Sequence, residues 1–164
     1  MDPIRLSISV QTPEFQQPFP VALLSGDFAE KMRKAAQFGA EGVELLTIDP
    51  AALDVADLGS AIERNGLQVA AVASGGLLYA LGLSLLHPDP EKASLAQQRL
   101  HDLIDLAGHL KAEVVTIGSF RGRASPVNGD ARGRLAEILY QAATAAAKRG
   151  VRLLWNRSTA TNPT

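Results

Sequence analysis

The residues with the clearest chemical capacity lie at the ends of predicted strands, where a parallel α/β fold places its binding groups. A carboxylate or carboxamide can hydrogen-bond a polar ligand, a Ser-Gly-Gly run lets the backbone approach one closely, and two nearby arginines can hold a phosphate or carboxylate through their forked donors. Six residues of these types are candidates for ligand binding: Gln11, Glu44, Ser74, Gly75, Arg121 and Arg123. A structural interpretation stays open for each: a salt-bridged or solvated polar group, a tight turn, or a solvated basic loop.

The histidines do not predict a metal site. His101, Asp105 and His109 follow one another at intervals of four residues, so they share one face of a predicted helix. That helix should belong to an outer layer, where a solvated face is expected. His87 precedes a helix start and is expected to order a loop. Cysteine is absent, which excludes disulfides and thiolate chemistry.

Composition narrows the class of protein. The 164 residues suggest one domain with a core of its own. The net charge of −1 gives no basic excess for a nucleic-acid partner. The N-terminus lacks the pattern of a signal peptide, and the longest apolar stretch is too mixed to span a bilayer. We therefore expect a cytoplasmic protein with no nucleic-acid and no membrane partner.

Strands and helices alternate along the whole chain. Strands are predicted over residues 5–11, 42–46, 68–74, 113–118 and 151–154, and helices over 27–39, 54–65, 89–110 and 130–149. Asp27 with Glu30 resembles a capping box, and Asp89 followed by Pro90 is a strong helix start. The region around Ser74-Gly75-Gly76 is predicted to be a turn. This alternation implies right-handed crossovers and a parallel sheet.

Two α/β architectures agree with this alternation: a five-stranded doubly wound sheet, or the first half of an eight-stranded barrel. The first strand alternates, with Ser7, Ser9 and Gln11 on one face and apolar residues on the other. Central strands of a doubly wound sheet are buried on both faces and are usually apolar throughout. Polar residues facing inward near a strand end favour a barrel mouth. The sequence therefore predicts a partial (β/α)8 TIM barrel of about four and a half βα units.

Three motifs then resemble one family. They are Gly42-Val43-Glu44-Leu45, Gly82-Leu83-Ser84 before His87-Pro88-Asp89-Pro90, and the run from Ile117 to Arg123. Together they resemble the xylose-isomerase-like barrel family of sugar phosphate isomerases and epimerases. The resemblance extends from Arg5 to Leu154, so residues 1–154 are expected to form the N-terminal half of such a barrel.

The resemblance implies a specific chemistry. In that family a divalent metal, manganese or magnesium, polarises a carbonyl, one carboxylate removes the adjacent proton and a second returns it. The metal ligands come from strands five to eight, which this chain does not contain in usable form. We therefore expect no catalytic residue, no metal ligand and no activity in this chain alone. The six candidate residues would supply a rim that faces a sugar or sugar phosphate, with Glu44 bonding a hydroxyl.

The tail over residues 155–164 has no apolar periodicity and no predicted helix. In the resembled family the fifth strand ends in Glu-Pro-Leu-Asn-Arg-Tyr-Glu. A Trp codon followed by either Asn codon, read from its third base, gives GAA for Glu, and the next codons admit the remaining six residues. We therefore expect a frameshift after Leu154 and a non-native or disordered tail. A truncated paralogue with an unrelated tail is the alternative.

Rival functions stay open. A flavodoxin-like domain or a non-catalytic half-barrel would be a binding or assembly module. The unpaired edges of the first and fifth strands would then promote a homo-oligomer. A metal-dependent DNA-repair branch of the same superfamily uses histidines at early strand ends. It is disfavoured because strands three and four end in Ser74-Gly75 and Gly118-Ser119.

Overall fold

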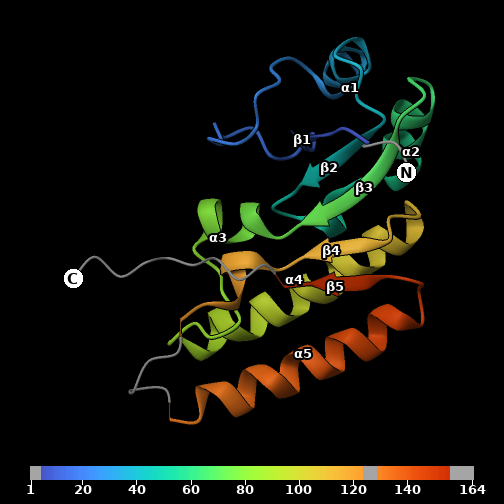
Figure 1. The fold of residues 1–164 in the computed structure, drawn as a ribbon. Coiled ribbons are helices and arrows are strands. Elements are labelled where there is room, and N and C mark those ends of the chain that lie inside the picture. Colours follow the sequence, from blue (N-terminus) through green and yellow to red (C-terminus); the bar gives the residue numbers. More distant parts are fainter. Residues whose placement is uncertain (1–4, 124–128, 156–164) are drawn as a thin grey trace.

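The computed structural model describes residues 5–123 and 129–155, which form a single parallel sheet with helices packed on it (Figure 1). Its strand order is sequential, and every neighbouring pair is parallel. The strands are β1 (Ser7–Gln11), β2 (Gly42–Leu46), β3 (Gln68–Ala73), β4 (Val114–Thr116) and β5 (Arg152–Leu154). The predicted strand over 113–118 is shorter than expected, because a 3-10 turn begins at Gly118 with a φ of +46°.

Four helices connect successive strands, and shorter turns lie at the carboxyl ends of the strands. The connecting helices are α1 (Phe28–Gln37), α2 (Val55–Glu63), α4 (Pro90–His109) and α5 (Ala131–Ala147). The short elements are α3 (Gly75–Leu81) and the 3-10 turns η1 (Pro50–Ala52) and η2 (Gly118–Arg121). Sequential strand order with right-handed crossovers places the connecting helices on one face of the sheet, as in a barrel. The flavodoxin-like alternative is wrong, because a doubly wound sheet reverses its strand order.

The predicted helix starts are confirmed by their caps. The carboxylate of Asp27 accepts the backbone N–H of Glu30 at 2.7 Å, and that of Asp89 accepts the N–H of Glu91 at 2.9 Å. Each bond satisfies a donor that has no partner within its own helix. These boundaries are readable from sequence because each cap involves residues only two or three positions apart.

The turn predicted at Gly75 and Gly76 is wrong, since both residues belong to α3. Glycine disfavours helix, so local propensity gives no signal for this element. Tertiary packing overrides that propensity: Leu77 is fully buried in the main core. The helix ends at Gly82, whose φ of +64° is left-handed.

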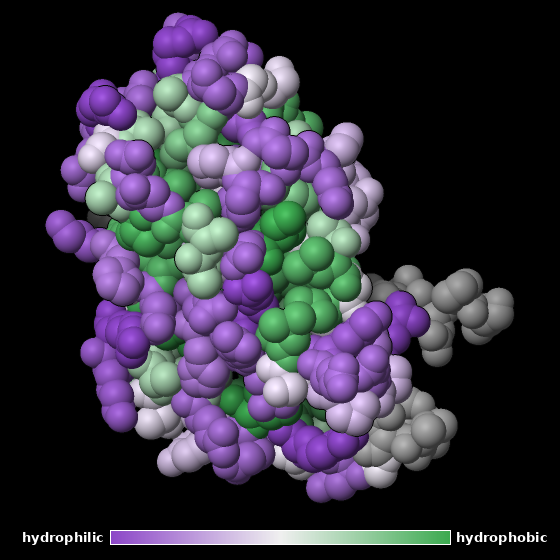
Figure 2. Space-filling view, turned by 180° about the vertical axis from the view of Figure 1, so that it is seen from behind, coloured by the Kyte–Doolittle hydropathy of each residue, from purple (hydrophilic) through white to green (hydrophobic). Residues whose placement is uncertain are grey.

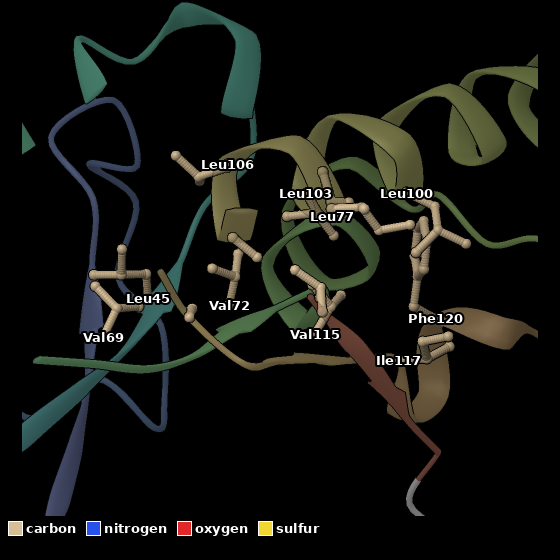
Figure 3. Packing of buried hydrophobic residues seen from close by; sticks show 14 of the residues in the cluster. Leu45, Val69, Val72, Leu77, Leu100, Leu103, Leu106, Val115, Ile117 and Phe120 are labelled. Atoms are coloured by element: carbon tan, nitrogen blue, oxygen red, sulfur yellow. The ribbon is translucent and has the colours of Figure 1, made fainter. Parts of the chain in front are cut away.

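The main core lies between the sheet and its helices. Val43 and Leu45 of β2 and Val72 of β3 are completely buried there. Figure 3 shows Val72 and Val115 on the strands near Leu103 and Leu106 of α4. Burying each such side chain contributes about 1.5–3 kcal/mol, which makes this layer the main source of stability.

The opposite side of the sheet, which we call the inner face, carries the alternate residues of each strand. Register aligns them in two rows across the sheet. The lower row consists of Ser9, Glu44, Ala71, Val114 and Arg152. The upper row, nearer the carboxyl ends, consists of Gln11, Leu46, Ala73, Thr116 and Leu154.

The outer side of the molecule is largely polar. Figure 2 views it from the side on which α2 and α4 lie behind the sheet in Figure 1, and hydrophilic side chains cover most of this surface. No helix in the described ranges is both long enough and apolar enough to cross a membrane. The expected domain, residues 1–154, therefore has one sheet and one main core in its described part, and the tail beyond Trp155 lies outside the described residues.

Candidate functional site

The connection between β1 and α1 folds over the carboxyl ends of β2 and β3. Thr12 starts this connection: its backbone N–H donates to the carbonyl of Leu46 at 3.0 Å, and its hydroxyl oxygen lies 2.9 Å from the same carbonyl oxygen. Phe15 is 1% exposed and packs on Leu46 and Ala73 of the upper row. This small second core therefore covers the upper row of the inner face where it crosses β2 and β3.

Aromatic side chains extend that second core toward α3. The ring centroids of Phe15 and Phe19 are 5.5 Å apart, and Phe19 meets Tyr79 edge-on at 4.9 Å. Such edge contacts contribute about 0.5–1.5 kcal/mol beyond simple burial. Local sequence patterns do not predict this aromatic cluster, because its residues belong to a proline-rich connection and to the unpredicted α3.

Gln11 ends β1 and holds this connection. Its side-chain Nε2 donates to the carbonyls of Phe15 and Gln17, at 3.0 and 2.6 Å. The residue is 8% exposed, and its own carbonyl accepts from the Lys31 ammonium at 3.4 Å. The amide protons of Gln11 are thus engaged within the chain, which agrees with a positioning role for this residue. Substrate binding by Gln11 stays a prediction.

Glu44 lies on the inner face in the lower row. It was expected at the end of its strand, but β2 continues two residues farther, to Leu46. Two residues of a strand span about 6–7 Å, so Glu44 lies below the layer that Phe15 covers. Ser9 donates its hydroxyl to Oε2 of Glu44 at 2.6 Å, and the carboxylate is half-buried. This pair presents an oriented carboxylate toward the inner face of the sheet.

Ser74 and the two glycines behind it serve internal packing. Ser74 is 1% exposed, and its hydroxyl lies 2.8 and 2.9 Å from the carbonyls of Thr116 and Ile117. A Cβ built on Gly76 would come within 2.7 Å of the Thr47 carbonyl oxygen and 2.9 Å of the Phe15 ring. At Gly76 the backbone thus lies close against another part of the protein, and this packing is distinct from the approach to a ligand that the sequence predicts. Ligand contact by Ser74 or Gly75 stays a prediction.

The carboxyl ends of the strands form an edge of the sheet that we call the rim. The two arginines follow β4 at this rim. Arg121 is half-buried and donates Nη1 to the Gly118 carbonyl at 3.1 Å. Its guanidinium carbon lies 5.5 Å from the centroid of the Trp155 ring, a cation–π distance. Arg123 is exposed and precedes residues 124–128, which lie outside the described ranges. Of the two, Arg121 has the more fixed position from which to hold an anion.

Glu14 is the polar residue that sequence reasoning missed. Its Oε1 accepts from the hydroxyls of Thr12 and Thr47, at 2.9 and 2.5 Å, and from the backbone N–H groups of Ile48 and Asp49, at 3.2 and 3.4 Å. Carboxylates that accept several such bonds form strong, charge-assisted contacts. Glu14 thereby fastens the connection after β1 to the segment after β2. No local signal marks it, because Thr47 is 33 residues away.

A second ionic group joins the same segment to α4. Arg99 lies between two carboxylates, with Nη1 at 2.5 Å from Asp49 and 3.2 Å from Asp102. The Arg99 side chain is 19% exposed, so this pairing is shielded from solvent more than an ordinary surface pair. Glu14, Asp49 and Arg99 together make the carboxyl-end rim a connected scaffold across β1, β2 and α4.

Lys31 is a buried cation beneath the rim. Burial lowers its pKa from the ordinary value of 10.5, because desolvation disfavours the ammonium form, and the negative charge of Asp27 opposes this shift. The Gln11 carbonyl is its hydrogen-bond partner. The amine supports the end of β1 from the helix side of the sheet.

The described residues do not fit a divalent metal centre. Within residues 5–123 and 129–155, no three or more His, Asp or Glu side chains gather closely enough to hold an ion. Asp105 pairs instead with Arg149 at 2.6 Å, and His101 and His109 are exposed on α4, as expected for an outer helix face. The described part of the chain therefore offers no set of side chains that could hold a divalent metal.

Comparisons with known proteins agree with this geometry. A family model described as xylose isomerase-like TIM barrel matches residues 32–155. No curated protein matches the chain. Among solved structures, D-allulose 3-epimerase from Methylomonas sp. in complex with D-allulose is 22% identical, with a TM-score of 0.63 over 93% of this chain and 51% of that one.

Two further structures are similar. A xylose isomerase domain protein from Planctomyces limnophilus is 14% identical, with a TM-score of 0.66 over 90% of this chain and 52% of that one. D-psicose 3-epimerase from Clostridium cellulolyticum H10, solved with D-tagatose, is 18% identical, with a TM-score of 0.59 over 79% of this chain and 46% of that one. The chain thus spans about half the length of the structures it matches. At these identities the likeness establishes the fold.

Proposed function

Because the chain belongs to the xylose isomerase-like TIM barrel family, we propose that it is the N-terminal half of a sugar or sugar-phosphate isomerase or epimerase. The observation that carries the proposal is the family match over residues 32–155, joined to a sequential parallel sheet. The parent reaction would be proton transfer next to a carbonyl, assisted in the complete enzyme by manganese or magnesium. The 164-residue chain would be inactive by itself.

The role of this half would be to bind and orient the sugar. Glu44, held by Ser9, would accept a hydrogen bond from a sugar hydroxyl. Arg121 and Arg123 would hold a phosphate where the substrate carries one, through paired guanidinium donors. The scaffold around Glu14 would keep the carboxyl-end rim of the sheet in place beside the sugar.

Sugar binding can be tested directly on the full chain. We would measure saturation-transfer NMR with D-allulose and D-tagatose, the sugars named for the similar structures. We expect weak transfer to the sugar that Glu44→Gln reduces and that Arg64→Gln, on the distant C-cap of α2, leaves unchanged. No transfer from a folded chain, or transfer insensitive to Glu44→Gln, would refute a sugar-binding half.

Inactivity has its own measurement. We would incubate the chain with each sugar and manganese in deuterated water. Neither sugar should take up deuterium at the carbon next to its carbonyl. Incorporation above the protein-free background would show that this half catalyses proton transfer, and the proposed inactivity would be wrong.

The frameshift after Leu154 is tested at the gene. Sequencing across the Leu154 and Trp155 codons should show that adding one base opens Glu-Pro-Leu-Asn-Arg-Tyr-Glu in the coding strand. If the corrected frame gives a different sequence, the tail is unrelated to the family and the frameshift hypothesis fails.

A half-barrel binding or assembly module is the second candidate. The observation that favours it is the pairing of β1 and β5 with only one strand each within the described residues. A folded chain that shows neither saturation transfer to the two sugars nor deuterium incorporation into them would leave this candidate in place.

A further inference from the structure

The two segments that pack together over β2 and β3 are free of charge. One is the connection after β1, which has no charged residue between Glu14 and Asp27. The other includes β3 and α3, and it has no charged residue between Arg64 and His87. In the whole chain one residue in five is charged, so this part of the rim is set apart by its neutrality.

The helix α3 brings Tyr79 to this uncharged part of the rim. Figure 1 shows α3 directly beyond the arrowhead of β3. One face of α3 lies against the connection after β1, because Gly76 contacts Phe15 and Ala80 packs on the second core. Tyr79 shares that face, one turn on from Gly76, and meets Phe19 edge-on. The tyrosine therefore belongs to the side of α3 that covers the inner face.

Tyr79 is the exposed end of the aromatic cluster. Its side chain is 58% exposed, whereas Phe15 is 1% exposed and Phe19 is half-buried between them. Phe19 thus supports one side of the tyrosine ring, and much of the rest faces solvent. A tyrosine combines a large apolar ring with a polar tip, and binding sites use such rings together with a few polar groups.

The distances separate Tyr79 from Glu44. Glu44 lies two residues, about 6–7 Å, below Leu46, the residue on which Phe15 packs. Beyond Phe15 the cluster continues with centroid separations of 5.5 Å to Phe19 and 4.9 Å from there to Tyr79. A sugar ring is about as large as one of these aromatic rings. A single sugar bonded to Glu44 therefore does not reach Tyr79, and a ligand that contacts both needs a second ring.

We propose that Tyr79, supported by Phe19, is an outer binding position for a second, uncharged ring of the ligand. The substrate class is then a glycoside, in which the sugar at Glu44 carries a further sugar or an aryl group. The apolar face of that ring stacks on Tyr79, where neither neighbouring segment offers a charge to a phosphate. This inference rests on the proposed function, because it places the sugar at Glu44.

Fluorine NMR of the full chain tests the proposal, because the chain has only two tyrosines, Tyr79 and Tyr140. Incorporated fluorotyrosine gives two signals, which Tyr140→Phe assigns. Tyr140 lies on α5 and is 72% exposed, so its signal is the internal control. We expect phenyl β-D-glucoside and cellobiose to shift the Tyr79 signal only. Methyl β-D-glucoside, which has the sugar without a second ring, should shift neither.

Affinity gives a second measurement. Tyr79→Ala should raise the Kd for phenyl β-D-glucoside about two- to tenfold, the range expected for one aromatic contact. Tyr79→Phe, which keeps the ring, should stay within about twofold of the parent chain, and Tyr140→Ala should leave the Kd unchanged. Circular dichroism would verify that each variant is folded.

Three results would overturn the outer position. If methyl β-D-glucoside shifts the Tyr79 signal equally, no second ring is needed. Benzyl alcohol carries a ring without a sugar, and an equal response to it would make Tyr79 a general apolar surface. If sugars bind in a way that depends on Glu44 and neither two-ring probe shifts Tyr79, this inference alone fails. If no sugar binds to the folded chain, the proposed function fails with it.

Discussion

Two adjacent glycines in α3 should respond in opposite directions to the same substitution. Gly75→Ala adds a methyl group whose nearest neighbour is the Phe19 ring at 3.7 Å, an ordinary contact. Gly76→Ala places the methyl 2.7 Å from the Thr47 carbonyl oxygen and 2.9 Å from the fully buried Phe15 ring. Neither neighbour is a flexible side-chain end, so the second methyl cannot be accommodated without displacing the rim.

The magnitudes follow from these distances. Replacing glycine by alanine in a helix gains up to about 0.5–1 kcal/mol. Gly75→Ala should therefore be neutral or stabilising by at most that amount. Overpacking a close contact costs about 1–3 kcal/mol, so Gly76→Ala should be destabilising in spite of its higher helix propensity. For a domain of this size each kcal/mol corresponds to roughly 2–4 °C in Tm.

Urea unfolding followed by circular dichroism measures both variants against the parent chain. The free energy of unfolding should fall for Gly76→Ala only, with an unchanged m-value, because the defect is local. A Gly76→Ala chain as stable as Gly75→Ala would refute the close packing of α3 on the rim. A crystal structure of the Gly76→Ala chain should show Phe15 displaced.

The rim and its buried lysine give two more predictions. Glu14→Ala leaves the donors of Thr47, Ile48 and Asp49 without their acceptor and should lower the free energy of unfolding by about 2–4 kcal/mol, while Glu14→Gln, which keeps an acceptor, should lose less than half of that in urea unfolding. Equal losses would contradict the network. Burial lowers the pKa of Lys31, so just below pH 10.5 the unfolded chain binds a proton that the folded chain does not. Stability should therefore rise with pH through that alkaline window, and Lys31→Met should abolish the rise and be more stable at neutral pH. Parallel pH profiles for the two chains would exclude this role.

The fold was predictable to a large extent because its signals are local. Alternation over residues 5–11 and the caps at Asp27 and Asp89 involve residues within a few positions of one another. The short α3 was not predictable, since its two glycines oppose helix and its packing, with Leu77 fully buried, is tertiary.

The candidate site was predictable only in part. Glu44 was identified on the inward face of its strand, but its place below the rim depends on how Phe15 folds back over Leu46. Gln11 was identified as a residue at a strand end, and only the structure shows its amide donating to Phe15 and Gln17.

The sequence by itself determined the parallel βα alternation, the helix caps and the family, since periodicity and motifs are written in neighbouring residues. Tertiary structure alone decided that Glu14 would collect donors from Thr47 and the following backbone, and that Gly76 would admit no side chain. The physical reason is that these contacts form between segments 29 or more residues apart, where each partner's position depends on the folding of the connection between them.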